Sequence, residues 1–345
     1  MSSPSPGVDE KDAPGAGPSV PVTEARTLVI LNPSAGGGRV RALAQRLARV
    51  VATHPNAART PVRLLMPDSV QQACLAVARL PPGSRVLVVG GDGSINRLLP
   101  ELLRSNHELG IVPAGSGNDA ARALGLRRMG PEAALHHALS APARRVDLGL
   151  AHLVGPGRVA SDAAVPFLSS LTAGFDAAVG HRAMQGPGWL RGMPRYLVAT
   201  LRELAVLRNR SLRVQVEGRT LHDGPLLFAS TLNTATYAGG MPCVPHARLH
   251  DGQLDLLLAG PFGRTGTLFM LPLLLMGRHL GHPGVRCSAA TDIELVSTEP
   301  VPIAADGEYL GEHSRVRIQV LPAALSVVHG ADENGSPRDV DAAIL

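Results

Sequence analysis

A short apolar run that leads directly into glycines and a carboxylate is the feature that most constrains this chain. The run is Val86–Val89, and Gly90-Gly91-Asp92-Gly93 follows it. Apolar, mostly β-branched runs of this length are typical of strands that are covered on both faces, as in parallel sheets. The glycines allow a sharp turn and bring backbone N–H groups close to a ligand. Because residues 93–96 predict the start of a helix, the segment indicates a phosphate-binding turn.

The first part of the chain repeats this alternation of strand and helix. Apolar runs predict strands at Thr27–Leu31, Val62–Met66 and Arg85–Val89, and apolar spacing predicts helices at Arg39–Ala52 and Ser69–Arg79. This order favours right-handed crossovers and a parallel sheet with helices on both faces. Ligands of such a sheet are expected at the carboxyl edge of its strands.

From about Arg144 the pattern changes to short alternating runs that Gly and Pro interrupt often. A helical insert is expected between Trp189 and Arg208. The pattern predicts an antiparallel sandwich or barrel. The predicted strands are Leu226–Leu232, Gly252–Leu258, Asp292–Val296, Val316–Val320 and Ala324–Val328.

These patterns divide the chain into two domains with a tail at each end. We expect a disordered tail over residues 1–24, an α/β nucleotide-binding domain over 25–143, a β-rich domain over 144–330 and a C-terminal tail over 331–345. The first tail is rich in Pro, Gly, Ser and Ala and has no apolar core of the kind that a signal peptide needs.

Composition narrows the function classes. With 345 residues and 45% apolar content the chain is globular, and 3% aromatic content argues against nucleic acid as a partner. Lys11 is the single lysine among 33 basic residues, so beyond the tail no lysine can serve a phosphate-binding P-loop or a Schiff base. A net charge of +5 suits an anionic partner, which includes an acidic membrane surface.

Cysteine spacing argues against two kinds of site. The three cysteines, Cys74, Cys243 and Cys287, are far apart in sequence and form no C-x-x-C pair. We therefore expect neither a disulfide framework nor a zinc site, and we expect the protein to occupy a reducing compartment.

The longest apolar segment, Thr267–Met276, is shorter than the roughly 18 residues that a membrane span needs. We expect it to be a buried helix, with a helix at the membrane surface as the alternative.

Three glycine-rich loops lie at predicted strand ends. They are Asn32–Gly38, Gly90–Ser94 and Gly110–Asp119. Each loop alone is a weak signal, but three in order on one sheet edge favour a nucleotide site. None is a G-x-G-x-x-G fingerprint, which disfavours a dinucleotide-dependent oxidoreductase.

In this order the three loops resemble the catalytic domain of the diacylglycerol kinase and sphingosine kinase superfamily, in particular its soluble bacterial lipid-kinase branch. The resemblance runs from about Thr27 to His329. It implies an ATP- and Mg²⁺-dependent kinase of lipid metabolism that is cytoplasmic and peripheral at the inner face of the membrane, with a membrane lipid as substrate.

The resemblance also implies which residues contact the nucleotide. They are Asn32, Pro33, Ser34, Ala35 and Gly36 in the first loop, Gly90, Gly91, Asp92, Gly93, Ser94, Ile95 and Asn96 in the second, and Ser116 and Asp119 in the third. Ser94 and Ser116 replace the family's usual threonine and keep the hydroxyl. Arg97 stands where glutamate is common, and Met66 where an ATP-contacting threonine is often found.

In the second domain, Arg248–Asp255 is similar to the family's D-G-x-L-D segment. The resemblance implies a structural Mg²⁺ held by the Asp251 side chain and by the carbonyls of Arg248 and Gln253, all of them oxygen ligands. The alternative is a plain Asp-Gly turn between strands. Asp147 is implied as a further metal-linked acid of the cleft, beside Asp92 and Asp119.

Ala305-Asp306-Gly307-Glu308 resembles the motif that carries the proton acceptor in these kinases. Phosphoryl transfer needs a carboxylate that accepts the acceptor hydroxyl's proton. The sequence leaves open whether Asp306 or Glu308 is this base. Arg39 is the candidate cation near the first loop, with a solvated helix arginine as the alternative.

Transfer of the γ-phosphate of ATP to a hydroxyl of a diacylglycerol-like or sphingoid-like lipid is therefore the expected function. A soluble-substrate kinase related to NAD kinase, which shares a G-G-D-G loop, is one alternative, and a nucleotide-binding regulator without catalysis is another. The lipid and the oligomeric state stay open, with a homodimer as one expectation.

Overall fold

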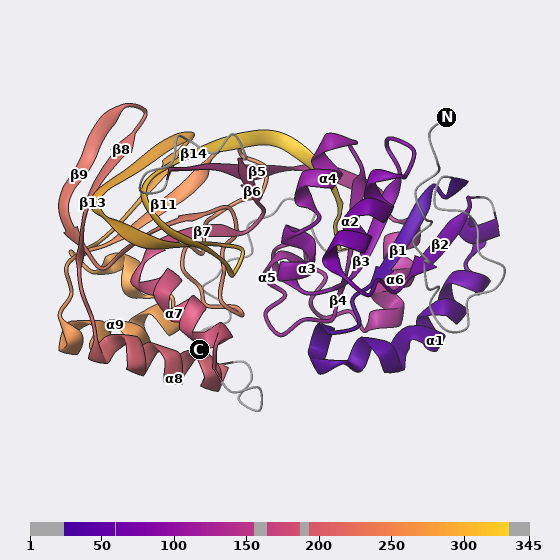
Figure 1. Cartoon of the computed structure of the whole chain (residues 1–345), viewed down its shortest axis with the longest axis horizontal. Coiled ribbons are helices and arrows are strands. Elements are labelled where there is room, and N and C mark those ends of the chain that lie inside the picture. The colour runs from indigo at the N-terminus through magenta and orange to yellow at the C-terminus, as the bar shows by residue number, and fades with distance from the viewer. Residues whose placement is uncertain (1–23, 59, 155–163, 187–192, 331–345) are drawn as a thin grey trace, which may run out of the picture. The chain divides into compact units, whose positions relative to one another are not determined.

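The computed structural model describes residues 24–58, 60–154, 164–186 and 193–330 (Figure 1). The predicted tails, apart from Glu24, and Trp189 lie outside the described residues. The described chain forms two compact units. Of the described residues, the first unit contains those up to Gly115 and Arg128–Ala143, and the second contains Ser116–Arg127 and those from Arg144 onward.

The first unit is built on a parallel sheet of four strands in the order β4-β3-β1-β2. The strands are β1 (Thr27–Leu31), β2 (Val62–Leu65), β3 (Arg85–Gly90) and β4 (Glu108–Pro113). β1 lies between β2 and β3 in parallel register, and β4 pairs with β3 in the same sense. The parallel sheet that the alternation predicts is confirmed.

Helices cover this sheet because its strands are apolar on both faces. Val29 and Leu87 belong to one cluster with residues of α1 and α6, and the alternate residues Leu28 and Val86 are fully buried as well. Ser69 caps α2, because its hydroxyl accepts a hydrogen bond from the Gln72 N–H at 3.1 Å. The helices are α1 (Arg39–Thr53), α2 (Val70–Ala78), α3 (Asp92–Asn96), α4 (Leu99–Arg104) and α6 (Pro131–Ser140), with short 3₁₀ turns η2 (Ala35–Gly37) and η3 (Pro55–Ala58).

The second unit is an antiparallel β structure. Its central strands run in the order β12-β11-β10-β7-β13-β14. β5 pairs with β14 and β6, and β8 pairs with β13 and β9. The bounds are β5 (Ala143–Val154), β6 (Val165–Phe167), β7 (Ser170–Gly174), β8 (Arg210–Val216), β9 (Arg219–Leu226), β10 (Phe228–Leu232), β11 (Leu254–Ala259), β12 (Val285–Ala290), β13 (Asp292–Ala305) and β14 (Glu308–Val328).

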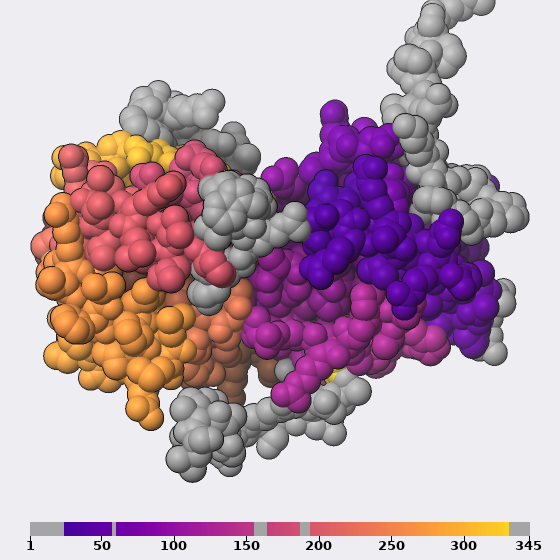
Figure 2. All heavy atoms as spheres, turned by 90° about the horizontal axis from the view of Figure 1, so that it is seen from below, coloured from indigo at the N-terminus to yellow at the C-terminus, as the bar shows by residue number. Residues whose placement is uncertain are grey.

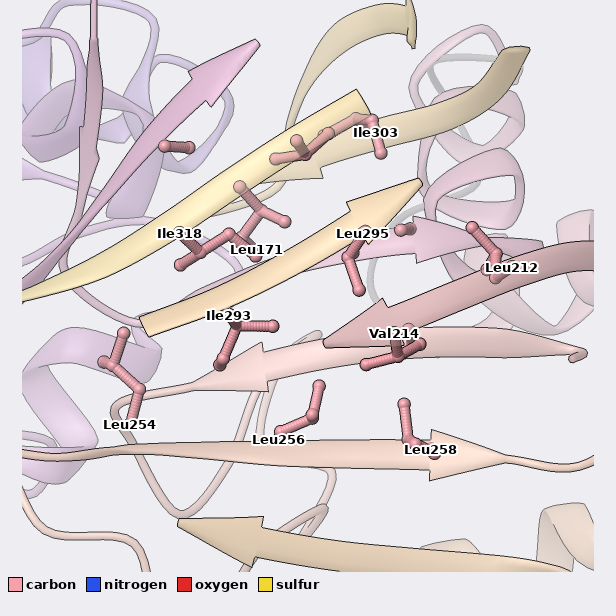
Figure 3. Packing of buried hydrophobic residues seen from close by; sticks show 14 of the residues in the cluster. Leu171, Leu212, Val214, Leu254, Leu256, Leu258, Ile293, Leu295, Ile303 and Ile318 are labelled. Carbon is pink, nitrogen blue, oxygen red and sulfur yellow. The ribbon is translucent and has the colours of Figure 1, made fainter. Parts of the chain in front are cut away.

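The core of this unit follows the two-residue period of its strands. Leu254, Leu256 and Leu258 of β11 point toward side chains of β13 and β8, among them Ile293 and Val214 (Figure 3). Because alternate residues of a strand face one side of a sheet, each strand contributes every second residue to this core. The predicted β-rich antiparallel sandwich is confirmed.

Two predicted strand breaks are absent. The expected strands Val316–Val320 and Ala324–Val328 belong to one strand, β14, although Pro322 separates them. Ala323 has a left-handed φ of 48°, and its N–H donates to Asp147 Oδ1 at 2.7 Å, so the bend keeps a hydrogen-bond partner. β13 also continues past the predicted end at Val296, through a register shift between Val296 and Val301.

The helices of the second unit include the predicted insert. They are α5 (Asp119–Ala123), α7 (Phe175–Met184), α8 (Met193–Ala205), α9 (Arg264–Leu275) and the 3₁₀ turn η4 (His279–Gly281). The expectation that the Thr267–Met276 segment is a buried helix is wrong. Met270 and Leu274 of α9 pack on the core, but Phe269 is 77% exposed and Leu268 is 49% exposed. Among the described residues, no helix is long and apolar enough to cross a membrane.

Candidate functional site

The first two glycine-rich loops meet at the carboxyl edge of the parallel sheet. Asn32 follows β1, and its N–H donates to the Val89 carbonyl of β3 at 3.0 Å. The Asn32 side chain donates through Nδ2 to Ser94 Oγ at 2.7 Å and accepts the Ser34 N–H at 3.0 Å. The Asn32 side chain therefore holds the conformation of the first loop and also links this loop to the second one.

Glycine is required where these loops approach each other. Gly36 has a φ of 60°, and a Cβ there would lie 2.8 Å from the carbonyl oxygen of Ala114, which follows β4. A Cβ on Gly90 would lie 2.6 Å from Ser94 Oγ. The Ala114 N–H also donates to the Gly90 carbonyl at 2.8 Å. The segments after β1, β3 and β4 are thus in direct contact. A side chain at Gly36 would push the first loop away from Ala114, and one at Gly90 would displace the Ser94 side chain that accepts the Asn32 hydrogen bond.

The polar groups of the second loop stay accessible while an apolar residue anchors it. Ile95 is 2% exposed, whereas Asp92, Ser94 and Asn96 are half-buried. Arg39 is exposed, and its Nε donates to the Gly36 carbonyl at 2.9 Å, so its guanidinium lies at the first loop. The structure therefore brings the predicted nucleotide residues from Asn32 to Gly36 and from Gly90 to Asn96 to one edge.

The third loop continues into the second unit. Ser116 is exposed there, and Asp119 is buried at the start of α5. The Asp119 carboxylate accepts the Gly239 N–H at 2.8 Å and the Thr236 hydroxyl at 3.3 Å. Arg122 Nε lies 3.7 Å from its Oδ1. Asp119 therefore ties α5 to the segment that follows β10.

Asp147 holds the turn that carries Asp251. One carboxylate oxygen of Asp147 accepts the Gly252 N–H at 2.7 Å, and the other accepts the Ala323 N–H at 2.7 Å. Its own N–H donates to the Leu249 carbonyl at 2.6 Å. Both oxygens therefore accept backbone hydrogen bonds, and the carboxylate ties β5 to the Asp251 turn and to β14, while its link to a metal stays a prediction.

The Asp251 turn fits a magnesium ion by the chemistry of its donors. Asp251 and Gln253 are exposed, Gly252 has a φ of 74°, and Asp251 Oδ1 accepts the Gln253 N–H at 3.1 Å. The donor set of one carboxylate and the carbonyls of Arg248 and Gln253 is all oxygen, as Mg²⁺ prefers. The structure contains an Asp-Gly turn directly before β11, as the alternative expected, and the magnesium role of these three donors stays a prediction.

Asp306 and Glu308 have different surroundings. The Asp306 carboxylate is buried and accepts three backbone N–H groups, from Leu168 at 2.9 Å, Ser169 at 2.7 Å and Ser170 at 3.0 Å. Its own backbone has a φ of 47°. Glu308 is half-buried, at the first position of β14 opposite Ala305. Asp306 therefore fixes the hairpin, and Glu308 is the more accessible carboxylate.

The sequence analysis did not identify the side chains after β10 that connect the segments carrying Asp119, Asp147 and Asp306. Asn233 follows β10, and its Nδ2 donates to the carbonyls of Asp147 at 2.8 Å and Leu168 at 2.9 Å. Thr234 and Thr236 lie in the same segment and contact the Ser169 carbonyl and Asp119. The sequence signal that could have identified them is an Asn and two Thr that follow directly after a buried strand.

Asp176 is a second missed residue. It lies in the first turn of α7, and its Oδ2 accepts the Ser230 hydroxyl at 2.6 Å and the Tyr237 hydroxyl at 3.2 Å. Burial raises the pKa of Asp176 to about 6, against the opposing effect of these hydrogen bonds. The segment after β10 therefore contacts three carboxylate-bearing elements, through Asn233, Thr236 and Tyr237.

Two family profiles match the chain in sequence. The diacylglycerol kinase catalytic domain matches residues 26–151, and the YegS C-terminal NAD kinase beta sandwich-like domain matches residues 169–329. Together they span both units.

Known proteins agree with this assignment. A diacylglycerol kinase of Mycobacterium tuberculosis is 32% identical over 256 residues, which cover 74% of this chain and 79% of that protein. A diacylglycerol kinase of Bacillus subtilis is 26% identical over 66% of this chain and 71% of its own. A crystal structure of a Bacillus anthracis diacylglycerol kinase shares the fold, with a TM-score of 0.62 and 19% identity over 89% of this chain and 97% of that one. The chain therefore belongs to the bacterial diacylglycerol kinase family of lipid kinases.

Proposed function

We propose that the protein transfers the γ-phosphate of ATP to a hydroxyl of a membrane lipid that resembles diacylglycerol or a sphingoid base. One observation carries the chemical part of this proposal. The chain combines a glycine-lined strand edge, with small polar groups and the Arg39 guanidinium beside it, with an accessible carboxylate next to a backbone-anchored one. Donors for phosphate oxygens and an acceptor for a proton are what phosphoryl transfer requires.

The nucleotide is assigned to the loops of the first unit. Close backbone approach at Gly36 and Gly90, together with the Ser94 hydroxyl and the Asn32 amide, supports phosphate binding there. Arg39 at the first loop supplies a cation in place of the missing lysine. When bound, Mg²⁺ neutralises phosphate charge, and Asp92 is the carboxylate of this edge that would face it.

Glu308 is assigned as the general base. It takes the proton of the lipid hydroxyl while that oxygen forms its bond to the γ-phosphorus. The bond from the γ-phosphorus to the β–γ bridging oxygen breaks, and ADP leaves with the electron pair. Asp306 is assigned as a positioning residue, because its two oxygens accept three backbone N–H groups and hold the turn that presents Glu308.

An exposed apolar face on the second unit supports a lipid over a soluble acceptor. α8 and α9 lie side by side on the face seen in Figure 2. Their outward side chains include Leu197 at 46% exposed, Leu201 at 49% and Phe269 at 77%. Large apolar side chains grouped on neighbouring helices are typical of a protein or membrane contact.

The charges on these helices and just beyond their ends favour an anionic membrane surface. Arg202, Arg208, Arg264 and Arg278 are exposed, and none of the four forms an ion pair with another described residue. Glu203 of α8 pairs with Arg182. Arginines around an apolar helix face suit peripheral binding to a membrane with acidic headgroups. We therefore propose peripheral membrane association on the cytoplasmic side, with this face against the lipid.

A transfer assay tests the activity. Purified protein, [γ-³²P]ATP and Mg²⁺ are incubated with diacylglycerol, sphingosine and phosphatidylglycerol in mixed micelles, and with NAD as the soluble acceptor. Label on one lipid, lost in Glu308→Gln and kept in Glu312→Gln on the same strand, supports the proposal. Label on NAD moves the protein to the soluble-substrate alternative. ATP binding without transfer to any acceptor supports the regulatory alternative.

Vesicle binding tests the membrane face separately. Phe269→Glu is expected to weaken sedimentation with vesicles that contain phosphatidylglycerol, because it places a carboxylate in the apolar face. Leu221→Glu is the matched control, since Leu221 is 39% exposed on β9. Equal binding by the two variants contradicts the assignment of this face. Both variants should keep ATP binding.

A further inference from the structure

Three side chains with different metal-binding atoms converge on the second unit, apart from the acids described above. They are His246, Asp255 and Cys287, and their ligand atoms lie within 4.8 Å of one another. His246 Nε2 is 3.4 Å from Asp255 Oδ1 and 3.9 Å from Cys287 Sγ. No sequence motif links them, because 41 residues separate His246 from Cys287.

We propose that His246, Asp255 and Cys287 form a binding site for a thiophilic divalent cation of the Zn²⁺ class. An imidazole nitrogen, a carboxylate oxygen and a thiolate are three ligands that zinc accepts, and a fourth position would be left for water. Binding releases the Cys287 thiol proton to solvent as the sulfur–metal bond forms. The site goes beyond the kinase activity and does not depend on it.

The distances fit tetrahedral coordination. Zinc bonds of about 2.0–2.1 Å to nitrogen, about 2.0–2.2 Å to oxygen and about 2.3 Å to sulfur at tetrahedral angles place nitrogen and oxygen about 3.4 Å apart and nitrogen and sulfur about 3.6 Å apart. The observed nitrogen–oxygen distance is 3.4 Å and the nitrogen–sulfur distance is 3.9 Å. These two distances lie within a few tenths of an ångström of the tetrahedral values, and the Asp255 oxygen and the Cys287 sulfur lie within 4.8 Å of each other.

The sheet register fixes two of the three ligands. Cys287 of β12 lies opposite Leu257 of β11, and Asp255 lies opposite Ala289. Asp255 and Cys287 are therefore diagonal neighbours on one face of an antiparallel pair, where long side chains reach each other. Asp255 is buried and Cys287 is half-buried, so the backbone of two strands holds them in place.

His246 supplies the third ligand from the segment between β10 and β11. It is exposed, so a cation and its water ligand can reach the site from solvent. Neighbouring residues of this segment hold Asp119 and Asp176 through Gly239 and Tyr237. A cation at His246 would therefore fasten the segment to the β11–β12 edge and stabilise the unit that carries Glu308.

This ligand set differs from the oxygen donors of the Asp251 turn. Thiolate and imidazole favour Zn²⁺, whereas carboxylate and carbonyl oxygens suit Mg²⁺. The two sets should therefore take different ions from a mixture, and excess Mg²⁺ should leave the His246, Asp255 and Cys287 site open to Zn²⁺.

Cobalt spectroscopy on the full-length protein tests the site. The protein is reduced, stripped with EDTA and titrated with Co²⁺ in a buffer with excess Mg²⁺. One equivalent of Co²⁺ is expected to produce the visible bands of tetrahedral cobalt and a thiolate-to-cobalt charge-transfer band, and Zn²⁺ should abolish both. Cys287→Ser should remove the charge-transfer band and weaken Zn²⁺ binding by more than about 100-fold, since loss of an outer partner alone costs 10–100-fold.

Cys74→Ser is the matched control, because Cys74 is also half-buried but lies on α2 of the first unit. It should keep the bands and the Zn²⁺ affinity. Zn²⁺ should also raise the melting temperature of the wild type and of Cys74→Ser but not that of Cys287→Ser or His246→Ala. Absence of the charge-transfer band at a large excess of Co²⁺, or a band that survives Cys287→Ser, overturns the proposal, provided that the metal-free variant melts like the wild type.

Discussion

The two units use backbone N–H groups in opposite ways. In the first unit, glycines at positions 36 and 90 let the loops pack so closely that a ligand would meet backbone and small polar groups. In the second unit, backbone N–H groups donate to carboxylates of the protein itself, those of Asp119, Asp147 and Asp306. The motif acids therefore differ in their surroundings: Asp119, Asp147 and Asp306 accept backbone N–H groups, and we propose that the more accessible Glu308 carries the chemistry.

Glu308→Gln should give the largest effect on activity, and it should separate the proposed catalytic carboxylate from the carboxylates that accept backbone N–H groups. Loss of the general base is expected to lower kcat by about 10²–10⁴-fold, while the melting temperature and ATP binding stay near the wild-type values. Steady-state transfer assays and calorimetric ATP titration measure the two quantities. A variant that keeps its activity, or that loses it together with its fold, contradicts the assignment of Glu308 as the base.

Asp306→Ala should instead lower stability. Removing the carboxylate leaves three buried backbone N–H groups without an acceptor, and we expect a loss of about 3–5 kcal/mol in the free energy of unfolding of the second unit. Urea denaturation followed by circular dichroism measures it. Glu312→Ala is the control and should change stability little, because Glu312 is exposed on β14, four residues beyond Glu308. If Asp306→Ala were as stable as the wild type, the hydrogen bonds of Asp306 would not be what holds this part of the second unit.

Asp176→Asn should change the pH dependence of stability. The folded pKa of about 6 lies above the usual 3.8, so between these values the folded state holds a proton that the unfolded state has lost. Wild-type stability should therefore fall, relative to Asp176→Asn, as the pH rises from about 4 to 6, and then level off. The difference is at most about 3 kcal/mol.

Urea denaturation at pH 4.5 and 7.5 measures this difference. Asp223→Asn is the control, because Asp223 is exposed on β9. A gap between the wild type and Asp176→Asn that is the same at both pH values would count against a raised folded pKa.

Gly36→Ala should give the smallest of these effects. The new Cβ would lie 2.8 Å from the Ala114 carbonyl oxygen, so the first loop must move, and ATP affinity should fall about tenfold. Gly38→Ala is a closely matched control, because Gly38 also has a positive φ, 90°, but a Cβ there meets nothing within 4 Å. If both variants lose the same affinity, backbone strain and not close packing explains the loss.

Sequence periodicity predicted the elements that depend on local pattern. The apolar run at Val86–Val89 and the helical spacing at Arg39–Ala52 appear as β3 and α1 within one or two residues. The continuity of β14 was not predictable, because a Pro normally ends a strand and the N–H of the next residue finds its partner in Asp147, 176 residues away. The exposure of α9 was missed because composition does not show which face of an apolar helix packs.

The candidate site was predictable only as a set of motif positions. The loops after β1 and β3 could be located from glycines, but the distinction between Asp306 and Glu308 depends on Leu168–Ser170, which are 136–138 residues from Asp306. The contacts of Asn233 with Asp147 and Leu168 are equally remote in sequence. Tertiary placement of distant segments, which no local pattern encodes, decides these roles.

The two hydrogen bonds of the Asp147 carboxylate have a consequence for how the protein is made. They join residues 105 and 176 positions apart, and the second partner, Ala323, lies near the end of the last strand. Contacts of such long sequence separation form late in folding. During synthesis the Asp251 turn therefore gains its full set of contacts only after β14 has been made. A nascent chain that stalls before residue 323 would carry a complete first unit but a second unit without its anchored turn.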